Sequence, residues 1–181
     1  GSRDYERALD AFTIAAKTLP NESKALAAIA YIRRRQGKFE EALEGLKKAF
    51  VLEPRGETLA RQIGISLKEL GRYADAIEYF DRSISLLPDQ RSAYVNKADT
   101  YLLWRGDTEK SRNTLEQAPT QYQPWQSLTW LDIYERKYQL ALDRLDHSPV
   151  NTAEHMTPVK GLIYRFMNDS VHSFASFDFA R

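Results

Sequence analysis

Three histidines are the side chains in this sequence best suited to catalysis or metal binding. They are His147, His155 and His172, and none forms an H-E-x-x-H pair or stands at metal-ligand spacing from another. His155 falls in a segment, residues 153–156, that has the character of a solvated loop. The chain has no cysteine, so thiol chemistry, disulfides and cysteine metal sites are excluded. The sequence therefore predicts no metal and no cofactor.

Motifs that bind nucleotides or present a nucleophile are also missing from the sequence. G-x-G-x-x-G, G-x-x-x-x-G-K-[ST] and G-x-S-x-G do not occur. The adjacent carboxylates Glu40 and Glu41 stand at a predicted helix start, where negative charge favours the helix dipole. Because no set of reactive groups converges, we expect that the chain is not an enzyme.

The charge balance argues against nucleic acid and membranes as partners. Lys and Arg number 26 against 25 Asp and Glu, and no stretch approaches the roughly 18 apolar residues of a membrane span. Residues 23–72 carry a local excess of basic residues that includes the run at 33–35. We expect Arg33 to face a neighbouring helix, and no aromatic residues interleave with a basic stripe as single-strand binders require. Nucleic-acid binding is therefore only the third interpretation.

The compartment and the parent protein stay open. Residues 1 and 2 are Gly-Ser, which resembles the remnant of a cleaved expression tag on an excised piece of a longer protein. An absent cysteine fits either a reducing or an oxidising compartment. We expect a soluble protein, with the cytoplasm favoured over the periplasm.

A repeat of 34 residues organises the first half of the chain. GKFEEALEGLKKAFVLEP at 37–54 returns as GRYADAIEYFDRSISLLP at 71–88. The same positions occur 34 residues earlier, so Tyr5, Ala8, Phe12, Ala15 and Pro20 match Phe39, Ala42, Leu46, Ala49 and Pro54. A constant period of this size indicates stacked structural repeats.

Each repeat has the pattern of two amphipathic helices. In residues 23–56, Leu26, Ile29, Ala30 and Arg33 have the spacing of one helical face, Gly37 breaks the helix, and Pro54 closes the second one. The small Ala30 and Ala42 stand where the paired helices approach closely. Because a single pair cannot bury both apolar faces, we expect successive pairs to stack.

This pattern resembles the tetratricopeptide repeat (TPR) family, and more loosely the TPR arrays attached to bacterial signalling proteins. The resemblance implies an all-α, right-handed superhelical solenoid of antiparallel helix pairs, one array over residues 3–181. Its predicted units are 3–20 (partial), 23–56, 57–90, 91–119, 122–149 and 157–181. The steps between equivalent positions of the later units are 35, 30 and 32 residues. The extra residue of the 35-residue step falls near 102–107, and we expect the second helices that end at Pro119 and Pro149 to be about one turn shorter. The shortening either changes the curvature or has no consequence.

The resemblance also implies a concave groove lined by the first helix of each unit, and thus a non-catalytic protein-interaction module. Its predicted peptide-binding residues are Lys24, Tyr31, Arg34, Arg35, Arg61, Lys68, Asp99, Leu102, Trp130 and Tyr134. The first half is basic and the second apolar, which fits a peptide that is acidic at one end. The charges could instead be merely solvated, and Trp130 and Tyr134 could pack against the last unit. The carboxylate clamp of chaperone-binding members is missing, since Ala27, Tyr31, Arg61 and Ile65 occupy its first positions.

The alternative is a self-association or regulatory segment of a larger bacterial signalling protein. The last predicted unit has no polar capping helix and carries Phe174, Phe177 and Phe179. Terminal repeats normally present a polar outer face. These residues would then form a homodimer contact.

Overall fold

The structure is a computed structural model that describes residues 5–19, 21–119, 124–148 and 157–173. The described elements are helices, and no strand occurs among these residues, so the all-α prediction is confirmed. The chain divides into two compact units, residues 1–122 and 123–181, and each is described by itself. No helix in the described ranges is long and apolar enough to cross a membrane.

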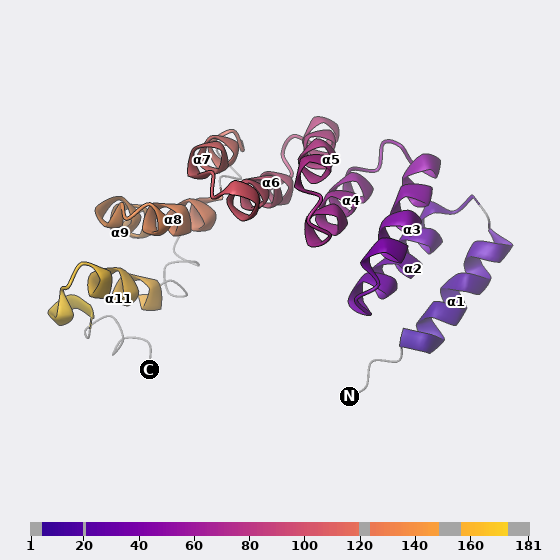
Figure 1. Cartoon of the computed structure of the whole chain (residues 1–181), viewed down its shortest axis with the longest axis horizontal. Helices are drawn as coiled ribbons and strands as arrows, with labels where there is room; N and C mark the ends of the chain where they lie inside the picture. Colours follow the sequence, from indigo (N-terminus) through magenta and orange to yellow (C-terminus); the bar gives the residue numbers. More distant parts are fainter. Residues whose placement is uncertain (1–4, 20, 120–123, 149–156, 174–181) are drawn as a thin grey trace. The chain divides into compact units, whose positions relative to one another are not determined.

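The first unit is a stack of helix pairs (Figure 1). Its helices are α1 (Tyr5–Thr18), α2 (Ser23–Arg35), α3 (Phe39–Leu52), α4 (Glu57–Glu69), α5 (Tyr73–Leu86), α6 (Arg91–Arg105) and α7 (Thr108–Glu116). The pairs are α2–α3, α4–α5 and α6–α7, and each pair packs on the next. The first helix of every pair starts at the first residue of a predicted repeat.

The second unit has shorter helices. They are α8 (Trp125–Tyr134), α9 (Tyr138–Asp146) and α11 (Thr157–Phe166), and α9 packs against both others. α11 begins at the predicted residue 157, whereas α8 begins three residues after the predicted residue 122. The single array over residues 3–181 stays a prediction.

The same turn geometry joins α2 to α3, α4 to α5 and α8 to α9. Gly37 and Gly71 have φ of 77° and 72°, the left-handed conformation that glycine adopts without a Cβ clash. The backbone N–H of Lys38 donates to the carbonyl of Arg33 at 2.9 Å, which closes the helix end in a Schellman motif. In the second unit, Arg136 takes the same conformation with φ 60° although it has a side chain. The glycine breaks predicted from the sequence are therefore confirmed.

The extra residue of the 35-residue step lies in the α6–α7 turn. α6 has 15 residues where α2 and α4 have 13. The N–H of Asp107 donates to the carbonyl of Tyr101, six residues back, whereas the equivalent bonds at the other turns span five residues. The sequence predicted the insertion at this place.

The second helices of the later pairs are short, as predicted. α7 and α9 have 9 residues each, against 14 in α3 and α5. Both lack more than one turn, which is a larger loss than the one turn that we expected. The effect on curvature stays a prediction.

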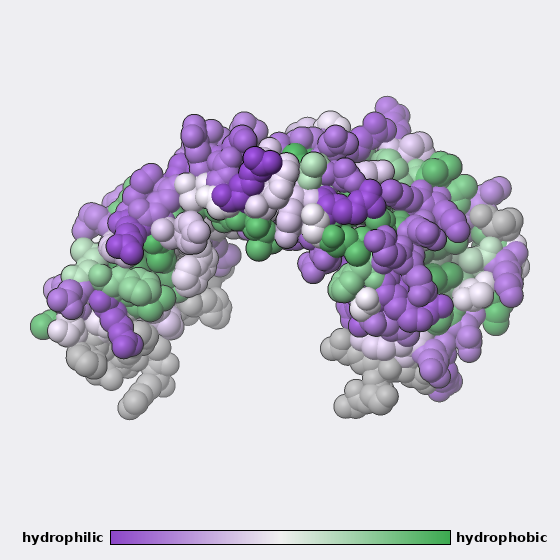
Figure 2. Space-filling view, in the orientation of Figure 1, coloured by the Kyte–Doolittle hydropathy of each residue, from purple (hydrophilic) through white to green (hydrophobic). Residues whose placement is uncertain are grey.

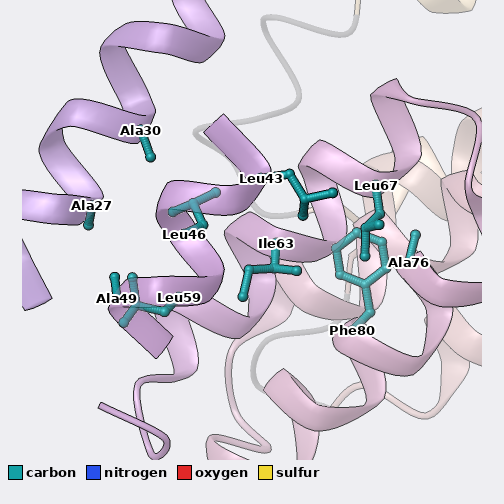
Figure 3. Packing of buried hydrophobic residues seen from close by; sticks show 10 residues of the cluster. All are labelled: Ala27, Ala30, Leu43, Leu46, Ala49, Leu59, Ile63, Leu67, Ala76 and Phe80. Carbon is teal, nitrogen blue, oxygen red and sulfur yellow. The ribbon is translucent and has the colours of Figure 1, made fainter. Parts of the chain in front are cut away.

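The core of the first unit lies between the helices of successive pairs (Figure 3). Ten buried residues from α2 to α5 form it: Ala27, Ala30, Leu43, Leu46, Ala49, Leu59, Ile63, Leu67, Ala76 and Phe80. Gly64 is essential to this packing, because a Cβ at that position would lie 2.6 Å from Cε1 of Phe80. The close approach predicted at Ala30 is confirmed for α2 and α3, because a Cβ at Gly45 would lie 3.1 Å from Cβ of Ala30.

The buried face of α2 differs from the predicted one. Ala30 is buried, but Leu26 and Ile29 are only partly buried. The residues that α2 buries are Ser23, Ala25, Ala27, Ala30 and Ile32. The predicted face was too narrow because α2 packs against helices on two sides. Arg33 faces α3, as predicted, where its Nε lies 3.3 Å from a carboxylate oxygen of Glu41.

Candidate interaction surface

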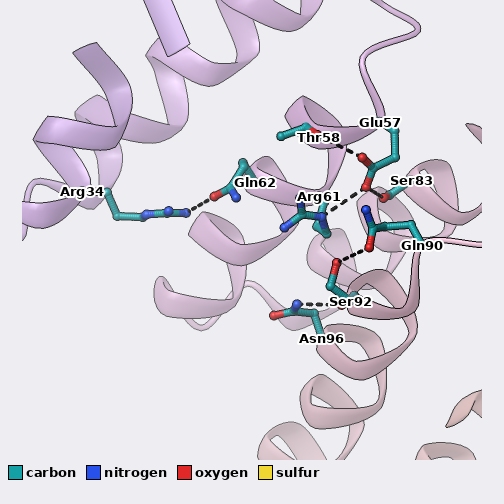
Figure 4. Close-up of polar contacts among 9 residues, drawn as sticks. All are labelled: Arg34, Glu57, Thr58, Arg61, Gln62, Ser83, Gln90, Ser92 and Asn96. Carbon is teal, nitrogen blue, oxygen red and sulfur yellow. Dashed lines mark hydrogen bonds and ion pairs between the residues drawn. The ribbon is translucent and has the colours of Figure 1, made fainter. Parts of the chain in front are cut away.

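Successive first helices are joined by a repeated polar contact. Nη1 of Arg34 in α2 donates to Oε1 of Gln62 in α4 at 2.6 Å, and Nζ of Lys68 in α4 donates to Oδ1 of Asn96 in α6 at 3.3 Å. Both contacts span 28 residues, so they join the same two positions of neighbouring repeats. Figure 4 shows the Arg34 side chain extending from α2 toward Gln62. Two of the predicted groove cations therefore hold neighbouring repeats in register.

A third predicted cation, Arg61, is engaged by an acidic residue. Its Nε lies 3.1 Å from Oε1 of Glu57 one helical turn earlier (Figure 4). The same oxygen accepts from the Ser83 hydroxyl of α5 at 2.9 Å, and the other accepts from Thr58 at 3.0 Å. The positive charge of Arg61 is thus neutralised within the unit, and this surface is less basic than the side-chain types alone indicate.

Tyr31 and Arg34 form a half-buried pair on α2. Cζ of Arg34 lies 5.7 Å from the centre of the Tyr31 ring, within the range of a cation–π contact. Burial raises the pKa of the Tyr31 phenol and lowers the pKa of the Arg34 guanidinium. No hydrogen bond to the Tyr31 hydroxyl is present within the described ranges.

A pocket of about 380 Å³ lies between α2, α4 and the loop that precedes α4. It is lined by Ser23, Lys24, Ala27, Ala28, Tyr31, Glu53, Arg55, Gly56, Glu57, Thr58 and Leu59. Its wall is stiffened by the Ser23 hydroxyl, which donates to Oε2 of Glu53 at 2.6 Å. Four of the lining residues, Lys24, Ala27, Tyr31 and Thr58, occupy groove positions that the TPR resemblance marks.

The other predicted residues of the first unit differ in environment. Arg35 is exposed at the last position of α2, and Leu102 is partly buried on α6. Asp99 is half-buried, and this burial raises the pKa of its carboxyl while the charge of Lys68 partly opposes the rise. Asp99 on α6 is thus near enough to Lys68 on α4 for the two charges to interact.

In the second unit, two aromatic side chains lie exposed on α8. Trp130 and Tyr134, one helical turn apart, are 48% and 67% exposed, whereas Ile133 packs into the core of that unit. The alternative in which both aromatics are packed away is therefore wrong for this unit. Asp132 on the same helix is buried and accepts from Nε of Arg144 on α9 at 2.9 Å. This buried ion pair fixes α8 on α9.

Comparison with known proteins decides the family. The family model described as tetratricopeptide repeat matches residues 1–50 and 61–123. The chain belongs to the TPR family. It is therefore built as a right-handed TPR solenoid of antiparallel helix pairs, and TPR proteins are generally non-catalytic modules that bind other proteins.

Similar proteins share the repeat at low identity. Protein CTR9 homolog of Arabidopsis thaliana is 35% identical over 94 residues, which are 51% of this chain and 8% of that protein. PilF of Pseudomonas aeruginosa is 18% identical with a TM-score of 0.73, over 96% of this chain and 81% of that one. YrrB, described as a TPR protein with an unusual peptide-binding site, is 15% identical with a TM-score of 0.63, over 96% and 92% of the two chains. The structural likenesses show the fold alone.

Sequence reasoning missed the partners of the TPR groove cations. Gln62 and Glu57 were not predicted as partners of Arg34 and Arg61, although Glu57 and Arg61 have the i, i+4 spacing of a helical ion pair. The 28-residue spacing of Arg34 to Gln62 also recurs in the sequence as Lys68 to Asn96.

Several predicted features lie outside the described residues. They are Phe174, Phe177, Phe179 and His155. Within the described ranges, no group of three or more His, Asp or Glu side chains could hold a metal ion.

Charged and polar side chains cover much of the visible surface of each unit, with apolar residues between them (Figure 2).

Proposed function

We propose that the first unit binds an extended peptide segment of a partner protein across α2 and α4. The observation that carries this proposal is the pocket between these helices, because groove positions from two successive repeats line it together. Its volume of about 380 Å³ falls in the usual range for ligand sites, roughly 300–1,000 Å³. One side chain of the peptide would enter this pocket.

The lining of the pocket indicates which peptide it accepts. Ala27, Ala28 and Leu59 supply an apolar floor, which suits an aliphatic or aromatic side chain. Lys24 is exposed at the rim and can pair with a carboxylate of the peptide. The Tyr31 hydroxyl can donate to a peptide carbonyl. We therefore propose an apolar residue next to an acidic one as the recognised pair, and the description of YrrB as a peptide-binding TPR protein supports this use of the fold.

The remaining predicted residues extend this proposal. Arg34, Arg61 and Lys68 would contribute a weakly basic field, and Arg35, Asp99 and Leu102 would flank the peptide. In the second unit, Trp130 and Tyr134 would serve as apolar anchors, since exposed aromatics are favoured in binding surfaces. A Trp130→Ser, Tyr134→Ser double variant tests that second contact separately from the pocket.

The test begins with selection of peptides from a random library displayed on phage. Lys24→Glu is expected to weaken the selected peptides about 10- to 100-fold, as loss of a charge-assisted hydrogen bond does, and Tyr31→Phe only a few-fold. Lys48→Glu is the matched control, because it makes the same charge change on an exposed position of α3 outside the pocket. Equal affinities for the Lys24→Glu and Lys48→Glu proteins would refute the pocket assignment.

Self-association is the second candidate, and exposed apolar residues near the end of the second unit favour it. Phe166 on α11, Met167 and Val171 are all exposed. If the predicted Phe174, Phe177 and Phe179 contact extends this surface, light scattering at increasing concentration should show a dimer. Val171→Glu should convert that dimer to a monomer, and a wild-type protein that is monomeric throughout would exclude this function.

A further inference from the structure

The α6–α7 turn, where the extra residue of the 35-residue step lies, holds another pocket. Its volume is about 270 Å³, and it is lined by Tyr101, Trp104, Arg105, Asp107 and Lys110. These residues come from the end of α6, the turn and the start of α7 (Figure 1). The pocket shares no residue with the one between α2 and α4, so the two sites can be tested independently.

An ion pair at this turn runs in the opposite direction from those at the α2–α3 and α4–α5 turns. In those two turns a basic residue precedes the second helix and pairs with an acidic residue three positions later. These pairs are Lys38–Glu41 at 3.6 Å and Arg72–Asp75 at 2.6 Å. At the α6–α7 turn the acidic residue comes first, and Oδ2 of Asp107 lies 3.3 Å from Nζ of Lys110. A cation therefore stands in α7 where α3 and α5 have a carboxylate.

Aromatic rings position the two cations of this pocket. Cζ of Arg105 lies 4.5 Å from the centre of the Trp104 ring, and Nζ of Lys110 lies 5.8 Å from the centre of the Tyr101 ring. Both distances are within the range of a cation–π contact. The Trp104 ring is itself placed by the preceding pair of helices, because its centre lies 6.4 Å from that of Tyr73 at the start of α5.

The guanidinium of Arg105 is open to an anion. Within the described ranges its side chain forms no hydrogen bond and no ion pair. A guanidinium stacked on a ring keeps the N–H donors along its edge, and two of them match the two oxygens of a carboxylate. Asp107 does not supply that carboxylate, because its Oδ1 accepts from the backbone N–H of Lys110 at 2.9 Å and its Oδ2 pairs with the ammonium of the same residue.

We propose that this pocket binds the carboxylate of an aspartate or glutamate side chain in a peptide of a partner protein. Two cations and one carboxylate line the pocket, and the one excess positive charge complements a single negative charge. A phosphate monoester fits less well, because it carries nearly two negative charges and the Asp107 carboxylate would repel it. The volume suits one side chain, since whole small-molecule ligands occupy roughly 300–1,000 Å³.

The surface beside the pocket indicates the neighbouring residue of the peptide. Leu103 and Trp104 are adjacent on α6 and are 63% and 38% exposed. They supply an apolar rim next to the cations, which favours an apolar residue beside the acidic one. This site lies outside the pocket between α2 and α4 and does not depend on the peptide proposed there.

The probe is the dipeptide Leu-Glu, acetylated at its N-terminus and amidated at its C-terminus, titrated into the full chain. NMR follows the indole N–H resonance of Trp104, which is identified by its loss in Trp104→Phe. Leu-Gln with the same blocking groups should bind at least about tenfold more weakly, because a charge-assisted hydrogen bond is lost. Arg105→Gln should weaken Leu-Glu by a similar factor. Lys48→Gln is the matched control, because it removes a cation at an exposed position of α3 outside the pocket.

An exchange within the reversed ion pair separates this site from general charge effects. The Asp107→Lys, Lys110→Asp protein keeps the net charge and the spacing of the pair, but it places a carboxylate at the Lys110 position of the pocket. α7 should still form, because α3 and α5 begin after Lys38 and Arg72 without a side-chain cap, and circular dichroism checks this. The exchanged protein should lose Leu-Glu binding.

Several results would contradict the proposal. They are an unchanged Trp104 resonance with Leu-Glu, equal binding of Leu-Glu and Leu-Gln, and full Leu-Glu binding by the exchanged protein. Tighter binding of a blocked Leu-phosphoserine dipeptide would show a phosphate site instead. Acetate that binds as tightly as Leu-Glu would show a site for free small carboxylates, and either of these last two results would also overturn the proposal.

Discussion

Because Gly64 contacts Phe80, we expect Gly64→Ala to lower the free energy of unfolding of the unchanged protein. We expect the same substitution to raise it when Phe80 is replaced by leucine. Gly64→Ala places a methyl group 2.6 Å from Cε1 of the buried Phe80 ring. Overpacking of this kind costs about 1–3 kcal/mol, and the higher helix propensity of alanine returns about 1 kcal/mol. We expect a net loss of about 1 kcal/mol of unfolding free energy, since the two effects partly cancel.

The second change reverses this effect. Phe80→Leu removes the ring and costs about 1–2 kcal/mol by itself, because buried apolar contacts are lost. In that background a Cβ at residue 64 no longer meets the ring, so Gly64→Ala should stabilise by about 1 kcal/mol through helix propensity alone. The coupling energy of the two changes is then about 2 kcal/mol, within the range measured for residues in contact.

Urea unfolding of the four proteins, followed by circular dichroism, measures this cycle. The m-value should stay constant, because the four chains expose nearly the same surface on unfolding. In thermal melts the 1 kcal/mol effects correspond to shifts of about 2–4 °C for a chain of this length. If Gly64→Ala has the same effect in both backgrounds, the argument that the absence of a side chain at Gly64 makes room for the Phe80 ring fails.

Three further predictions concern other parts of the molecule. Arg144→Met removes the Nε–H donor of Arg144 from the buried Asp132 carboxylate and should lower the free energy of unfolding by about 2 kcal/mol, whereas adding Asp132→Leu should recover most of the loss in urea unfolding. The pKa of Asp99 is raised in the folded state, so its ionisation destabilises the fold as pH rises; Asp99→Asn should increase stability at about pH 7 and leave it unchanged at about pH 3, below both pKa values. Arg136→Gly, at φ 60°, should raise the melting temperature by relieving about 1 kcal/mol of left-handed strain.

The repeat was predictable from the sequence because packing constrains it. Gly37 and Gly71 must adopt positive φ, and Leu46 and Phe80 must fill the same space, so their types recur at a fixed period. Arg136 shows where this signal is lost, because the same turn is built there without glycine. The helix ends followed from these turns, which is why α2, α4 and α6 start at the predicted residues.

The interaction surface was predicted less well because few of its residues are constrained by packing. The groove positions gave Arg34, Arg61 and Lys68 as ligand-binding cations. Whether a cation meets a ligand or a neighbour depends on the register of successive helices, which the sequence of one helix does not specify. In the structure these three bind Gln62, Glu57 and Asn96 respectively.

These contacts change which residues should determine ligand selectivity. A side chain that already donates to a neighbour must give up that bond to meet a ligand, so the net gain is small. Lys24 and the Tyr31 hydroxyl carry no such cost, because neither side-chain group is hydrogen-bonded within the described ranges and both border the pocket. We therefore expect changes at Lys24 to alter which peptides bind, whereas Arg34→Gln and Lys68→Gln should mainly lower stability by loosening the contact between repeats.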